Sequence, residues 1–147
     1  EDRYKGERRF FFSRFKLAVF IVGFVLFLPV LPAQETVKSP VPPELSQKDS
    51  LGQIRSIYKA EYARAGKRSK SALAAKQSLA QALLKAGMET KDDPVIAYSL
   101  FNEARLMAVE AGVVDLAVEA LGRLIHRYEF DPREMRLETF QRLAQRA

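Results

Sequence analysis

The sequence predicts an all-α protein, in which an N-terminal transmembrane or signal helix precedes a bundle of about five antiparallel helices. Three observations support this prediction. An uncharged apolar run fills Leu17–Ala33. Beyond residue 50, apolar residues recur at the three- to four-residue spacing of amphipathic helices. No stretch shows the alternating pattern that indicates half-buried strands. The helical part is expected to form two hairpins and a closing helix.

Composition limits the classes of protein to consider. The 147 residues leave room for one modest domain besides the apolar run. Cysteine is absent, which excludes disulfides and thiolate metal sites. The net charge is +6, of which residues 1–16 and residues 44–147 each supply +3. The domain is therefore only mildly basic, which argues against a nucleic-acid partner.

The apolar run and its flank predict membrane insertion. Arg8, Arg9, Arg14 and Lys16 precede Leu17–Ala33, and positive charge before an apolar run places that side in the cytoplasm. As a helix the run spans roughly 25 Å, close to the thickness of a bilayer's hydrocarbon core. We expect a single-pass protein of the inner membrane, with residues 1–16 in the cytoplasm and the domain in the periplasm.

A cleavable signal peptide is the alternative. Pro29 and Pro32 weaken the end of the helix, and Ala33 is small, as the residue before a cleavage site should be. Leu31 is larger than signal peptidases prefer at its position. Cleavage after Ala33 with export of the domain therefore stays open beside the anchor.

Residues 34–43 predict a proline-rich linker. Pro40, Pro42 and Pro43 favour extended polyproline II geometry and exclude a regular helix. Such a segment would hold the domain, residues 44–147, away from the bilayer.

The first two helices are expected to run from near Ser50 to Gly66 and from Ser69 to Ala86. Gln53 follows Ser50 at the spacing of a capping box. Gly66 and Gly87 are typical helix stops.

The remaining helices begin with clearer signals. Asp93 can cap the amides of a third helix whose first residue is Pro94, and Gly112 ends it. A fourth helix begins near Asp115. The pair Asp131-Pro132 repeats the start signal for the last helix, with Glu134 as the partner of a capping box. The last helix presents Leu137, Phe140, Leu143 and Ala144.

The two Asp-Pro starts enclose one helical hairpin, at a distance close to the period of tetratricopeptide units, which is about 34 residues. The stretch Leu83–Ile125, with Thr90–Pro94, Asn102–Arg105 and Ala111–Gly112 as its characteristic elements, resembles a tetratricopeptide-like helical module of exported or membrane-anchored proteins from planctomycete-type bacteria. This resemblance covers roughly residues 54–147. It implies a helical-hairpin fold and brings no known activity, ligand or catalytic residue.

No constellation of residues predicts catalysis, a cofactor or a metal. His126 is the single histidine, so it cannot belong to a multi-histidine site, and we expect a structural or surface role. Glu89, Asp92 and Asp93 form a small acidic cluster, but calcium loops need more oxygen ligands at ordered spacing. We therefore expect a protein without enzymatic activity.

Two groups of residues are candidates for an interaction surface. The aromatic group is expected to supply mostly core residues, and would mark a partner surface if two or more members were exposed together. The basic group forms either a solvated loop or a contact with anionic lipid, nucleic acid or an acidic partner. The candidates are Tyr98, Phe101, Tyr128 and Phe130, with Phe140 as a further aromatic, and Lys67, Arg68 and Lys70.

These observations favour a membrane-anchored extracytoplasmic scaffold that binds another protein. One alternative is a small structural or accessory subunit of a membrane protein complex. A second alternative is a secreted helical domain with an unrecognised enzymatic or accessory role. The identity of the protein partner does not follow from the sequence.

Overall fold

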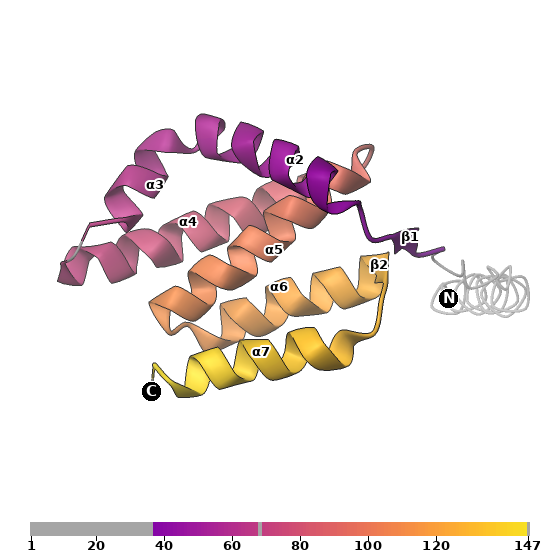
Figure 1. The fold of residues 1–147 in the computed structure, drawn as a ribbon. Coiled ribbons are helices and arrows are strands. Elements are labelled where there is room, and N and C mark those ends of the chain that lie inside the picture. Colours follow the sequence, from indigo (N-terminus) through magenta and orange to yellow (C-terminus); the bar gives the residue numbers. More distant parts are fainter. Residues whose placement is uncertain (1–36, 68, 147) are drawn as a thin grey trace, which may run out of the picture. The chain divides into compact units, whose positions relative to one another are not determined.

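The computed structural model describes residues 37–67 and 69–146, which form helices and two very short strands (Figure 1). The all-α class is confirmed. The helices are α2 (Glu44–Ile57), α3 (Lys59–Ala65), α4 (Lys70–Glu89), α5 (Pro94–Ala111), α6 (Val114–Arg127) and α7 (Pro132–Ala144), and the strands are β1 (Ser39–Pro40) and β2 (Tyr128–Glu129).

The apolar run Leu17–Ala33 and its basic flank lie outside the described residues. Within residues 37–67 and 69–146, none of the helices has the length and apolar character needed to cross a membrane.

Helix α5 occupies the centre of the domain. Helices α4, α5, α6 and α7 lie side by side, and α2 and α3 cross over α4 and α5 (Figure 1). The most extensive contacts of α5 are with α4 and α6, and it also contacts α2 and α7. Consequently most of its side chains are buried.

Small residues allow the central helices to approach closely. Ala97, Ala104 and Ala108 of α5 are fully buried, as are Ala117 and Ala120 of α6. Since alanine adds only a methyl group, the neighbouring helix can pack directly against the backbone at these positions.

The first predicted helix is two helices in the structure. The helical segment begins at Glu44, immediately after Pro43, and is interrupted at Tyr58. The part before Tyr58, α2, packs on α5, and the part after it, α3, packs on α4. The expected start near Ser50 is wrong. Ser50 lies inside α2, where its hydroxyl donates to Gln47 O (2.9 Å) and shares a 2.5 Å hydrogen bond with the Ser99 hydroxyl.

The predicted stop at Gly87 is also wrong, because α4 continues to Glu89. Gly87 instead permits a close approach. A Cβ atom built at this position would lie 2.7 Å from Phe101 Cε1, which is closer than real Cβ contacts. The absent side chain therefore leaves the space that the Phe101 ring occupies.

Three other helix signals behave as predicted, whereas the capping-box bond expected of Glu134 does not occur among the described residues. The Asp93 carboxylate accepts a hydrogen bond from the Ile96 amide (2.9 Å), with Pro94 as the first residue of α5. Gly112 ends α5 in the left-handed conformation, with φ of 72°. The Asp131 carboxylate accepts from the Arg133 amide (3.0 Å) at the start of α7.

The described part of the predicted linker, residues 37–43, packs on the domain and does not form a free spacer. Ser39 and Pro40 pair in parallel with Tyr128 and Glu129. Pro42 is buried, and its carbonyl accepts a 2.6 Å hydrogen bond from Gln47 Nε2. The expectation of extended backbone holds, because Ser39–Pro40 is a short strand.

The close approach at Gly87 generates a prediction for stability. We expect Gly87→Ala to lower the free energy of unfolding by about 1–3 kcal/mol, because the new methyl group must displace the buried Phe101 ring. Urea unfolding of the domain measures this change.

Gly122→Ala is the matched control. Gly122 lies within α6 and has open space around its Cβ position. Alanine there should raise the free energy of unfolding by about 0.5–1 kcal/mol, through its higher helix propensity. Equal stabilisation by both substitutions would contradict the described packing of Phe101.

Candidate functional site

Three of the four aromatic residues proposed for an interaction surface are core residues. Tyr98, Phe101 and Tyr128 are at most 6% exposed, which corrects their place among the surface candidates. The rings of Tyr98 and Tyr128 meet edge to face with centroids 5.0 Å apart. The Tyr128 hydroxyl donates to Pro94 O (2.6 Å). These aromatic side chains fill the space between helices and are not available to a partner.

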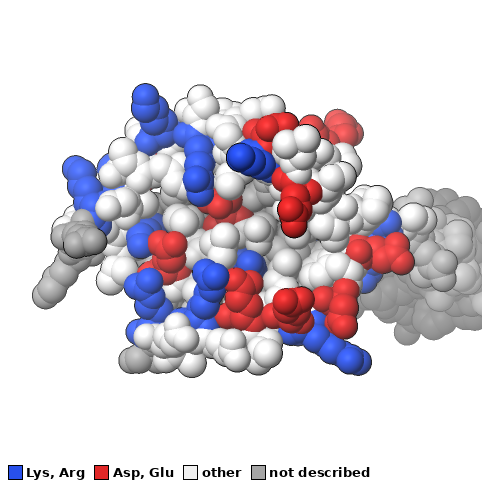
Figure 2. All heavy atoms as spheres, viewed as in Figure 1, with Lys and Arg blue, Asp and Glu red and all other residues white. Residues whose placement is uncertain are grey.

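The remaining candidates do not form one surface in the described structure. Phe130 is partly buried against the core. Lys67 is exposed after α3, Arg68 lies outside the described residues, and Lys70 is the first residue of α4. Figure 2 shows acidic and basic side chains interspersed over one face of the domain, without a broad area of one sign.

The outer face of α7 carries the clearest exposed apolar pair on one helix. Leu137 and Phe140 are 59% and 50% exposed, although the sequence pattern groups them with Leu143 as one face. The structure instead buries Thr139 and Leu143. Because a helix turns about 100° per residue, Leu137 cannot share a narrow stripe with Leu143.

Two arginines accompany this apolar pair. Arg133 and Arg136 are both exposed. Arg133 lies two helical turns before Phe140, and Arg136 lies one turn before it. Arg133 lies 4.0 Å from the exposed Asp131 carboxylate, and no ion pair of Arg136 is found among the described residues. We call Arg133, Arg136, Leu137 and Phe140 the α7 face.

The opposite side of α7 is fixed to the core by Arg105. This side chain on α5 is buried, and its guanidinium donates to Thr139 Oγ1 (2.8 Å), Glu138 Oε2 (3.3 Å) and Asn102 Oδ1 (2.9 Å). Burial lowers the pKa of Arg105, and the nearby Glu138 carboxylate opposes that effect. The contact fixes the rotation of α7 about its axis, so that the α7 face points away from the core.

A second buried charge has a structural explanation. Glu103 of α5 accepts a 2.7 Å hydrogen bond from the Tyr62 hydroxyl and lies 3.6 Å from the Arg55 guanidinium. The Arg55 guanidinium also sits 5.7 Å from the centroid of the Tyr62 ring. This cluster joins α3 to α5 and presents no free nucleophile or base.

One small pocket lies beside α6. It has a volume of about 270 Å³ and is lined by Val37, Met88, Phe101, Arg123, His126 and Arg127. The acidic cluster of the sequence does not form a cation site here. Asp93 caps α5, and among the described residues no group of three histidine, cysteine or carboxylate side chains is arranged to hold a metal.

Comparison of the chain with models of protein families, with curated proteins and with solved structures gives no match.

The buried tyrosines generate a prediction for alkaline pH. Burial raises the pKa of Tyr128 from 10.0 to about 12, and it also raises the pKa values of Tyr62 and Tyr98. Above pH 10 the unfolded chain releases the Tyr128 proton while the folded chain retains it. The contribution of Tyr128 to the free energy of unfolding should therefore be constant below pH 10 and fall as the pH rises toward 12.

We expect Tyr128→Phe to reduce this loss by about 1–2 kcal/mol between pH 8 and pH 12. At pH 8 the variant itself should be about 1 kcal/mol less stable, because Pro94 O loses its donor. Urea midpoints at both pH values measure the effect. Tyr58→Phe is the control, since no hydrogen bond of the Tyr58 hydroxyl occurs in the described structure. An unchanged loss in Tyr128→Phe would count against this explanation.

Proposed function

We propose that this chain is a membrane-anchored, extracytoplasmic helical scaffold that binds another protein through the α7 face. The exposed pair Leu137 and Phe140 carries the proposal. Contiguous exposed apolar side chains mark contact surfaces, whereas single ones are common on any protein. The basic flank and uncharged run of the sequence support the anchor.

The geometry favours a partner with a complementary helix. Leu137 and Phe140 lie three residues apart, so both project from one side of α7. An amphipathic helix can lay an apolar stripe on such a face. Arg133 and Arg136 beside this pair favour acidic residues at the edge of that stripe.

The hairpins support a scaffold. Helices α5 and α6 form an antiparallel pair between the two Asp-Pro starts, and α7 packs beside α6 as the last helix (Figure 1), which supports the proposed tetratricopeptide-like arrangement. Because Arg105 holds α7 against the core from behind, the helix backbone is already ordered before a partner binds, which limits the conformational entropy lost on binding.

The proposal predicts a selective loss of binding. We expect the double variant Leu137→Ser/Phe140→Ser to bind its partner at least tenfold more weakly, because each lost apolar contact contributes on the order of 1 kcal/mol. Co-purification of the full chain from membranes in mild detergent, with the stoichiometry of the bound protein quantified, measures the loss.

Leu73→Ser is the matched control. Leu73 lies on α4 and is 49% exposed, so its substitution perturbs the surface to a similar degree away from α7. Equal loss of the partner in both variants, or its full retention in the double variant, would contradict the assignment. Arg136→Glu should also weaken binding, and an acidic-to-basic change in the partner should restore it.

A further inference from the structure

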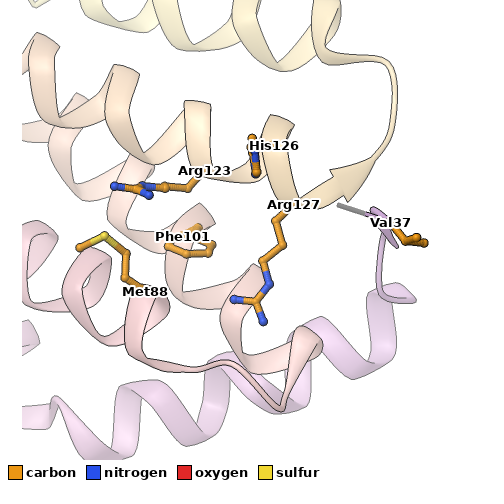
Figure 3. Close-up of a pocket in the computed structure, with 6 residues that line it drawn as sticks. All are labelled: Val37, Met88, Phe101, Arg123, His126 and Arg127. Carbon is orange, nitrogen blue, oxygen red and sulfur yellow. The ribbon is translucent and has the colours of Figure 1, made fainter. Parts of the chain in front are cut away.

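The pocket beside α6 combines an apolar wall with two guanidinium groups. Met88 and Phe101 supply apolar surface from α4 and α5, and Val37 adds to it from the segment before β1. In Figure 3, Arg123 and Arg127 extend from α6 on either side of Phe101, while His126 points away from them. Gly87 allows Phe101 to hold this position, because a side chain there would displace the ring.

The positive charge of Arg127 is not neutralised by a carboxylate within the described residues. Its guanidinium donates to Thr90 O (2.8 Å) and Lys91 O (2.9 Å), the carbonyls that follow the end of α4. These acceptors carry only partial charge. An arginine has five N–H donors, so Arg127 keeps donors for a further acceptor.

Arg123 adds a second charge at the edge of the pocket. It pairs with Glu119 at 3.3 Å, but both side chains are about half exposed. An exposed pair of this kind contributes little free energy, so a bound anion can compete for Arg123. Among the described residues, no carboxylate side chain lines the pocket.

From this combination we infer that the pocket binds a small organic carboxylate with an apolar body. The carboxylate pairs with the Arg123 guanidinium, whose planar fork matches its two oxygens, and Arg127 adds positive charge on the other side of Phe101 (Figure 3). The apolar body contacts Met88 and Phe101. The volume of about 270 Å³ is below the range of pockets for drug-sized ligands, roughly 300–1,000 Å³, which limits the body to about one ring.

A monocarboxylate fits these donors better than a phosphate does. A phosphate dianion presents three oxygens and a larger desolvation cost, whereas part of the Arg127 guanidinium is already engaged by carbonyl groups. This inference does not depend on the protein contact proposed for α7.

Methionine methyl NMR of the full chain tests the inference directly. The chain contains three methionines, of which Met88 lines the pocket, while Met107 and Met135 pack against the core. We expect benzoate to shift the Met88 methyl signal in a saturable way and to leave the other two in place. Benzamide, which has the same shape without charge, and acetate, which lacks the apolar body, should each bind at least fivefold more weakly.

Variants separate a pocket effect from a general one. Arg123→Gln should lower the affinity for benzoate at least threefold. Arg133→Gln on α7 should leave it unchanged. Arg127→Gln is less suitable as the main test, because its loss also removes the donors to Thr90 O and Lys91 O.

Three results would overturn the inference: no saturable shift of Met88, equal binding of benzamide, or equal binding of acetate or inorganic phosphate. The first result would show that the pocket binds no benzoate. The second would show that the ligand needs no charge, and the third that it needs no apolar body. A loss of partner binding in the α7 variants with benzoate binding retained would show that the two surfaces act separately.

Discussion

Four helices of the domain, α2, α4, α6 and α7, depend on their packing against α5. Fully buried alanines along α5 let the neighbouring helices approach closely, and close approach gives the dense van der Waals contact that stabilises a small core. On α4, Gly87 serves the same purpose by admitting Phe101. A larger residue at any of these positions would push the neighbouring helices apart.

Helix α5 also supplies the buried polar contacts that fix the orientation of α2, α3 and α7. Ser99 forms a hydrogen bond with Ser50 of α2. Glu103 accepts a hydrogen bond from Tyr62 of α3. Arg105 donates one to Thr139 of α7. Each group is buried and must find its partner, so each contact selects one register for the helix opposite. For α7, this selection leaves Leu137 and Phe140 facing outward.

The helical class and the capped starts of α5 and α7 could be predicted, because local chemistry determines them. Asp93, Pro94 and Gly112 act within one turn of the chain. The role of Gly87 could not be predicted, since a glycine near a helix end is a common stop, and only packing against Phe101 shows why α4 continues.

The orientation of α7 likewise depends on a distant side chain, Arg105. Without it the sequence pattern places Leu137 and Phe140 on one helix face with Leu143. It also groups Phe140 with Tyr98 and Tyr128, as aromatic residues that are mostly core. The pocket was missed because its residues come from four separate segments and share no sequence spacing.

Site-specific photo-crosslinking in intact membranes tests the central claim most directly, with a photoreactive phenylalanine analogue placed at position 140 or at position 73. The account predicts a cross-link from position 140 to an acidic amphipathic helix of a different protein, and none to that protein from position 73. Cross-links from position 140 to lipid or to a second copy of this chain alone, or the same partner from both positions, would contradict it.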